Sequence, residues 1–256
     1  MSETEKDFCF CTLALRQKYR LLAKQLAEDL DTYSPGTSLV VGTDEPEDFR
    51  EQKNVLAFEH LQKGILHCYN DKRFVLEKAL SKFQTAIIID SDTRIIEKVP
   101  SYIEWKSGIT AKTENLLIHV KKYNPERLLS LKTVAKKLNI SIDDVSWVGE
   151  SLFIISRDNG KEIEFLKQWG KIGNYLELKG IHSGEGNSIG LAAAKIGWTV
   201  NHANWDEIKA VTNHLDASYN QSSITFSDNL KRRIGYHYRL NVTRLQALSD
   251  FDFYYR

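Results

Sequence analysis

The sequence predicts an α/β protein with a mixed, mainly parallel sheet and helices on both faces. Short apolar runs without helical spacing alternate along the chain with segments whose apolar residues recur at helical spacing. The run at 86–89 is continuously apolar, as is usual for a strand that is covered on both faces. The chain has 256 residues, 42% of them hydrophobic and 27% charged, which is enough to bury a sizeable core.

The elements of the first half are the clearest. We expect strands at 8–15, 38–42, 55–58 and 86–89, with helices at 19–30 and 72–83. The second half is less regular, and its patterns favour a strand at 116–119, a helix at 125–138, a strand at 147–156, a helix at 162–170, a polar loop at 181–188, a helix at 189–196 and a strand at 198–201. From Leu230 onward the tail mixes basic and aromatic residues.

Composition excludes several classes of function. Lys+Arg 35 against Asp+Glu 34 leaves a formal charge of +1, so no global field attracts nucleic acid or an anionic membrane, and a polyanion would have to be bound by a local basic patch. No apolar stretch reaches the roughly 20 residues of a membrane helix, and the first residues lack the pattern of a signal peptide. We therefore expect a cytoplasmic protein. Cys9, Cys11 and Cys68 are an odd number without a CxxC spacing, which favours reduced thiols, with Cys9 and Cys11 packed in the core.

Asp90 and Asp92 stand out among three Asp-x-Asp spacings. Asp29 and Asp31 end a predicted helix, where a solvated turn explains them, and Asp250 and Asp252 have no strand before them. The pair in AIIIDSD follows a buried strand, and ligands of parallel sheets bind at the carboxyl ends of the strands. Two such carboxylates can converge on one hard divalent cation. The alternative is a pair of capping aspartates that begins a turn before Arg94.

Two segments resemble one known family. Residues 87–96, IIIDSDTRII, resemble the apolar strand, Asp-x-Asp and Thr segment of nucleotide-sugar-dependent glycosyltransferases of the GT-A fold, in particular glycogenin-like and related bacterial enzymes. Residues 12–19, TLALRQKY, keep the Thr-Leu-Ala, four residues, Tyr spacing that cradles uridine in those enzymes. The resemblance implies a GT-A-like (Rossmann-like) fold and a single catalytic domain over 1–256, with 8–97 binding the nucleotide sugar and 98–256 the acceptor.

The resemblance also implies roles for single residues. Asp90 and Asp92 would bind Mn2+ or Mg2+. The donor would contact Thr12, Leu13, Ala14, Tyr19, Arg73 and Ser91, with Tyr19 stacked on the base, Ser91 beside the ribose, and Arg73 one residue out of the family's register. The family's late His-x-x-Gly-x-x-Lys-Pro-Trp segment is missing here. As third metal ligand we favour His214 for its polar neighbours, followed by His202 and His237.

Candidate catalytic groups lie in the second half. Gly149 and Glu150 stand where the family faces its acceptor. Glu185 precedes a predicted helix, where inverting relatives place the general base; the alternative is an acidic residue that interacts favourably with the helix dipole. The basic cluster at 231–233 is either a cover for the donor diphosphate or a solvated helix face, and with the nearby tyrosines it could form a peripheral membrane surface.

Together these features predict a metal-dependent glycosyltransferase of the hexosyltransferase type. It would transfer a sugar from a nucleoside diphosphate, expected to be UDP, to a hydroxyl of a carbohydrate or another acceptor. Two alternatives stay open. One is a nucleotidyltransferase of similar fold, against which the absence of a Gly-rich basic loop after the first strand counts. The other is a non-catalytic, GT-A-like nucleotide-binding protein.

Overall fold

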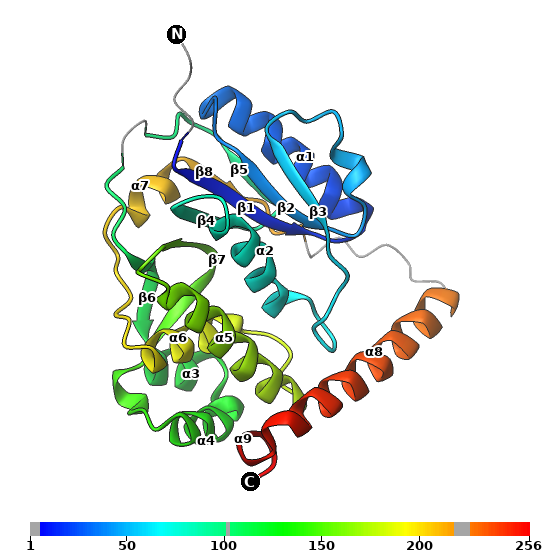
Figure 1. Cartoon of the computed structure of the whole chain (residues 1–256), viewed down its shortest axis with the longest axis vertical. Helices are drawn as coiled ribbons and strands as arrows, with labels where there is room; N and C mark the ends of the chain where they lie inside the picture. Colours follow the sequence, from blue (N-terminus) through cyan, green and yellow to red (C-terminus); the bar gives the residue numbers. More distant parts are fainter. Residues whose placement is uncertain (1–5, 101–102, 218–225) are drawn as a thin grey trace.

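A six-stranded mixed sheet forms the centre of the computed structural model, which describes residues 6–100, 103–217 and 226–256 (Figure 1). Its strand order is β3-β2-β1-β4-β7-β6. The strands are β1 (Phe8–Ala14), β2 (Leu39–Thr43), β3 (Val55–Glu59), β4 (Thr85–Ile89), β6 (Gly108–Asn115) and β7 (Ser146–Ser156). Strands β1 to β4 pair in parallel, whereas β7 runs antiparallel to both of its neighbours. The predicted α/β class and mainly parallel mixed sheet are confirmed.

Helices cover both faces of the sheet because the strand residues alternate between two cores. Cys9 and Cys11 belong to one core with α2, α3, α4, α5 and α6, while Phe8 and Phe10 belong to the other with α1 and α7. The helices are α1 (Arg16–Tyr33), α2 (Lys72–Leu80), α3 (Leu116–Tyr123), α4 (Leu128–Leu138), α5 (Lys161–Leu178), α6 (Glu185–Lys195), α7 (Trp205–Ala210), α8 (Phe226–Ala247) and α9 (Phe251–Tyr255). Cys9 and Cys11 are free thiols buried on one face, as predicted, and burial raises the pKa of both.

A second, two-stranded sheet joins distant parts of the chain. Strand β5 (Thr93–Ile95) pairs antiparallel with β8 (Thr212–His214), so that Thr93 lies opposite His214. Buried Asp29 of α1 holds β5 in place, since its carboxylate accepts hydrogen bonds from Arg94 Nε at 2.6 Å and from the amide of Ile95 at 3.1 Å. The prediction of a solvated turn was therefore wrong for Asp29, while Asp31 is exposed.

Three predictions for the second half were wrong. Residues 116–119 form helix α3 rather than a strand, because the side chain of Asn115 caps it by accepting hydrogen bonds from the amides of Leu117 and Ile118. The expected polar loop at 181–188 ends early, since α6 begins at Glu185. Residues 198–201 do not form a strand, although Asn201 forms an isolated β-bridge with Thr110.

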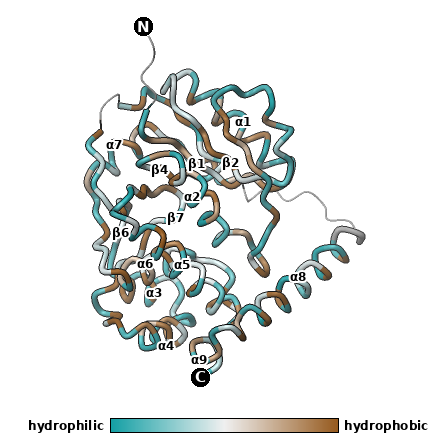
Figure 2. Tube along the Cα trace, viewed as in Figure 1, coloured by the Kyte–Doolittle hydropathy of each residue, from teal (hydrophilic) through white to brown (hydrophobic). Residues whose placement is uncertain are grey.

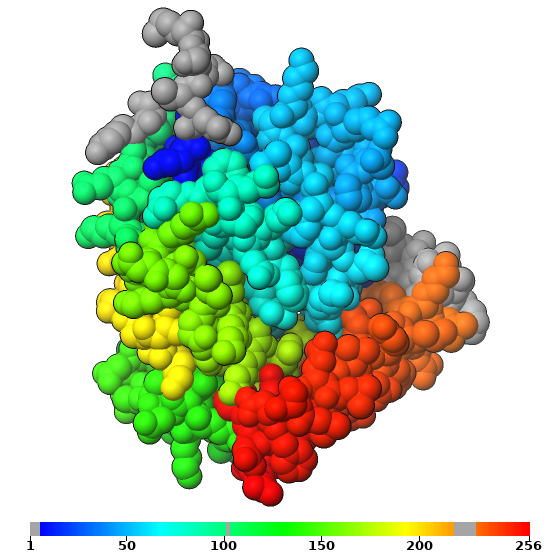
Figure 3. Space-filling view, viewed as in Figure 1, coloured from blue at the N-terminus to red at the C-terminus, as the bar shows by residue number. Residues whose placement is uncertain are grey.

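Helix α8 runs along one edge of the molecule (Figure 3) and packs against α5. Polar and apolar residues alternate along it, as Figure 2 shows. Among the residues that the structure describes, no helix combines the length and the apolar composition needed to cross a membrane.

Candidate functional site

A pocket of about 420 Å³ opens at the carboxyl ends of β1 and β4. This is the edge where parallel sheets hold their ligands. The predicted residues that line the pocket are Leu13, Tyr19, Asp90, Ser91, Asp92, Glu150, Glu185 and His214. They come from both halves of the chain, so the fold brings together the predicted donor side and the predicted acceptor side.

Asp90, Asp92 and His214 lie close together in this pocket and form an Asp-Asp-His group. One potential ligand atom from each lies within 4.8 Å of the other two. His214 reaches the two aspartates because β8 pairs with the strand that follows Asp92. The carboxylate of Asp92 accepts a hydrogen bond from the amide of Ala217 at 2.9 Å, and His214 Nδ1 lies 3.1 Å from Thr93 Oγ1.

These three side chains fit a divalent cation by their chemistry. Carboxylate oxygens are the ligands that Mg2+ and Mn2+ prefer, and an imidazole can complete such a set. The hydrogen bond from Ala217 fixes one oxygen of Asp92 and leaves Oδ1 turned toward His214, at 3.6 Å. Such outer contacts are what orient metal ligands in proteins. Metal binding itself stays a prediction.

Lys72, at the start of α2, contacts both the Asp-Asp-His group and the catalytic candidates Glu150 and Glu185. Its Nζ lies 2.7 Å from Asp90 Oδ1 and 3.0 Å from Glu185 Oε1, and it donates a hydrogen bond to the carbonyl of Glu150 at 2.9 Å. Sequence reasoning missed this residue and chose its neighbour. The signal was present, because Lys72 falls at helical spacing with buried Val75, Leu76 and Ala79, and a lysine on the core face of a helix needs acidic partners.

Glu150 and Glu185 come from β7 and α6, which approach each other closely. A Cβ on Gly186 would lie 2.1 Å from the carbonyl oxygen of Val148, and one on Gly190 would lie 1.8 Å from that of Ser146. Only glycine permits this contact between helix and strand. The same approach lets Glu150 Oε2 accept a hydrogen bond from the amide of Gly186 at 2.8 Å, while Glu185 is buried beside Lys72.

The charges of the pocket shift one another's pKa. Burial alone would lower the pKa of Lys72, but Asp90 and Glu185 raise it above its usual value, so the ammonium stays charged. Burial raises the pKa of Asp90, and the charge of Lys72 opposes this change. Burial also raises the pKa of Glu150, and the neighbouring charge of Glu185 raises it further. Such shifted groups in a pocket are typical of functional sites.

Aromatic and basic side chains line the rest of the pocket. Tyr19 is half-buried, and the rings of His67 and Tyr69 stack with centroids 4.9 Å apart. Arg232 reaches the pocket from α8. Arg16 also lines the pocket, and its backbone is in the left-handed conformation with φ 73°. The carboxylate of Asp44 stabilises this conformation, because it accepts a hydrogen bond from the Arg16 amide at 3.0 Å.

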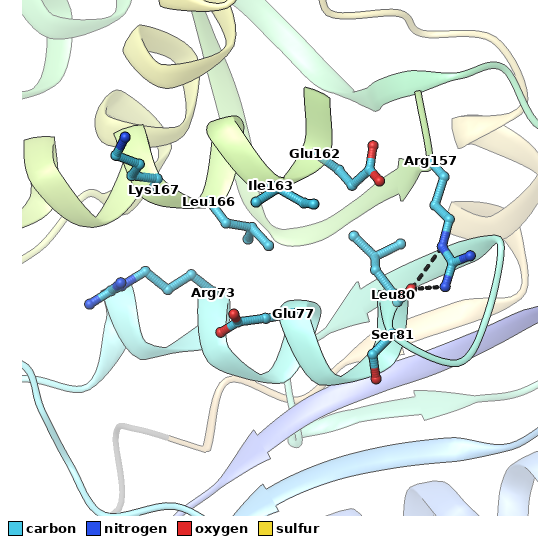
Figure 4. A pocket seen from close by; sticks show the side chains of 9 residues that line it. All are labelled: Arg73, Glu77, Leu80, Ser81, Arg157, Glu162, Ile163, Leu166 and Lys167. Carbon is cyan, nitrogen blue, oxygen red and sulfur yellow. Dashed lines mark hydrogen bonds between the residues drawn. The ribbon is translucent and has the colours of Figure 1, made fainter. Parts of the chain in front are cut away.

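Six predicted candidates do not line the pocket, and one of them, Gly149, is buried in β7. Thr12 and Ala14 are buried in β1. Arg73 lines a different pocket of about 550 Å³ between α2 and α5, shown in Figure 4, because one residue along a helix turns the side chain by about 100°. His202 lies near Ala111 and Asp206, and His237 is on α8 against Tyr236. The structure thus separates His214 from the other two histidines.

Comparison with models of known protein families finds none that matches the chain, and no curated protein matches it.

Proposed function

We propose that this protein is a metal-dependent glycosyltransferase that uses a nucleoside diphosphate sugar, expected to be a UDP-sugar. The observation that carries the proposal is the convergence of Asp90, Asp92 and His214 at the carboxyl end of β4, in one pocket with Glu150 and Glu185. The resemblance of TLALRQKY and IIIDSDTRII to GT-A enzymes supports the same function, because both segments border this pocket.

Glycosyl transfer forms a bond between an acceptor oxygen and the anomeric carbon of the donor and breaks the bond from that carbon to the diphosphate. Asp90, Asp92 and His214 would hold the cation, which when bound supplies positive charge that stabilises the departing diphosphate. Arg16 and Arg232 line the same pocket, and a guanidinium suits phosphate oxygens by its geometry. Tyr19, which lines the same pocket, would stack on the base.

We assign the general base to Glu150 rather than Glu185. Glu185 is already paired with Lys72, whereas no ion pair to the Glu150 carboxylate is found among the described residues. Burial and the charge of Glu185 raise the pKa of Glu150, so that its ionised carboxylate is a stronger base and in that form would take the proton of an acceptor hydroxyl. Glu185 would then serve to hold Lys72 in position. A buried Glu185 and a half-buried Glu150 in the same pocket also favour catalysis over the non-catalytic alternative.

Replacement of Asp92 by Asn tests the metal site. The amide oxygen of Asn can still accept the hydrogen bond from Ala217, so the fold should be retained while the charged ligand is lost. We expect Mn2+-dependent binding of UDP, measured by calorimetry, to weaken at least about 100-fold, which corresponds to about 3 kcal/mol.

The control is Asp31→Asn, which changes an exposed carboxylate of another Asp-x-Asp spacing. It should bind as the wild-type protein does. A thermal-shift screen of UDP-, GDP-, CMP- and TDP-sugars with and without Mn2+ would identify the donor, because a ligand of the folded state raises the apparent stability. Equal UDP affinity for Asp92→Asn and the wild-type protein would refute the metal assignment.

A further inference from the structure

Helix α8 carries an apolar stripe on the side that faces solvent. Leu230, Ile234, Tyr238 and Leu245 are between 50% and 69% exposed. Their spacing of four, four and seven residues places them within an arc of about 80° on one side of the helix. Exposed apolar residues continue past the helix at Leu248, Phe251 and Tyr255. A stripe of this length is unusual on a surface that contacts only water.

The opposite side of α8 fixes the orientation of the helix. Arg239 donates hydrogen bonds to the carbonyl oxygens of Gly64 at 2.8 Å and of Ile65 at 3.0 Å, and Thr243 and Ala247 are buried. These residues lie roughly opposite the apolar stripe on a helical wheel. The stripe is therefore presented outward by a helix that is attached to the protein along its other face.

Positive charge accompanies the stripe. Between Asp228 and Asp250 the sequence has five arginines and lysines and no acidic residue, although the whole chain carries a formal charge of only +1. Lys231 borders the stripe on one side, and Arg233 and Arg244 border it on the other. All three side chains are exposed. An apolar stripe between basic residues is the pattern of a helix that lies in the interface of an anionic membrane.

We propose that α8 and α9 bind the surface of an anionic lipid bilayer, with the apolar stripe in the acyl boundary and the three flanking cations at lipid phosphates. The charges favour lipid over a second copy of this chain, because two such helices face to face would bring their cations together. Arg232, on the same helix, lines the pocket, so membrane binding places the pocket about one helix diameter, roughly 10 Å, from the bilayer. This inference does not depend on the proposed glycosyltransferase activity.

Sedimentation with vesicles tests the proposal on the full chain. We expect the wild-type protein to bind phosphatidylcholine vesicles that contain about 30% phosphatidylglycerol, and to bind pure phosphatidylcholine about tenfold less or weaker. Raising the salt to about 0.5 M should release much of the protein, because salt screens the lysine and arginine contacts. Wild-type protein that stays in the supernatant with the anionic vesicles would overturn the proposal.

Matched variants separate the stripe from the rest of the surface. Ile234→Ser/Leu245→Ser should lower binding about tenfold or more, and Lys231→Gln/Arg233→Gln/Arg244→Gln should do the same on anionic vesicles. The apolar control, Leu129→Ser/Ile163→Ser, changes side chains on other helices that are 77% and 70% exposed, and the charge control is Lys121→Gln/Lys132→Gln/Lys136→Gln. Both controls should bind as the wild-type protein does.

Analytical ultracentrifugation without lipid tests whether a second copy of the chain binds the apolar stripe. The proposal expects the wild-type protein and Ile234→Ser/Leu245→Ser to have the same mass. A wild-type dimer that becomes a monomer in this variant would show that the stripe binds a second copy of the chain and would overturn the membrane assignment.

Discussion

Removing the charge of Lys72 should destabilise the folded protein. A cation bound in the pocket should reduce this loss of stability. In Lys72→Met the carboxylates of Asp90 and Glu185 lose a partner that lies within 3.0 Å of both. Breaking a buried ion pair from one side costs about 3–5 kcal/mol, and we take about 3 because the Asp90 side chain keeps 27% of its exposure. For a chain of this size, that loss lowers Tm by about 6–12 °C.

The assay is chemical denaturation with and without Mn2+. If the ion binds beside Asp90, its charge substitutes in part for the lost ammonium, so the deficit of Lys72→Met should shrink when Mn2+ is saturating. Lys78→Met, an exposed lysine on the same helix, is the control and should unfold as the wild-type protein does. Adding Glu185→Gln to Lys72→Met should recover stability because it removes one unpaired charge. A deficit that is the same with and without Mn2+ would refute the reasoning.

Two further carboxyl groups allow sharp tests. Glu150→Gln keeps an oxygen that can accept the hydrogen bond from the Gly186 amide, so this variant should bind UDP and Mn2+ normally. Its rate of sugar transfer should fall at least about 100-fold in a sugar-release assay. Normal turnover would exclude Glu150 as the base. Burial raises the pKa of Glu177 from its usual 4.5 to about 7. The folded protein then holds a proton that the unfolded chain releases, so this group stabilises the fold below about pH 4.5 and the effect is lost as the pH rises through 7. Glu177→Gln should remove about 2.5 kcal/mol of this pH dependence between urea titrations at pH 5 and pH 8, and an unchanged dependence would contradict it.

Strands that are buried on both faces were predictable from the sequence. The apolar run at 86–89 corresponds to β4, and the run at 152–155 lies in β7, within the strand predicted at 147–156, because the part of a central strand that is covered on both faces is mostly apolar. Local side-chain contacts overrode the pattern elsewhere. LLIH at 116–119 has the apolar residues of a strand, yet the cap at Asn115 starts a helix there and leaves Ile118 on the surface, 62% exposed.

The pocket was predictable in part. A buried strand that ends in two aspartates marks its own site, and Asp90 and Asp92 line the pocket as expected. His214 was favoured for its polar neighbours, but the pairing of β5 with β8 is what brings it to the pocket. Strands of three residues are too short for this pairing to be predicted from the sequence. Arg73 was chosen from the family resemblance although it is one residue out of the family's register, and one helical step decides that Lys72 and not Arg73 faces the pocket.

The two-stranded sheet also sets an order of events during synthesis of the chain. Thr93 and His214 are 121 positions apart, so Asp90 and Asp92 leave the ribosome long before their third neighbour exists. A nascent chain that has reached α2 and β4 can begin to build the central sheet, but closing the loop to β8 must wait for the later residues and costs the entropy of a long loop. The proposed affinity for a divalent ion should therefore appear late in folding, when both halves of the chain have come together.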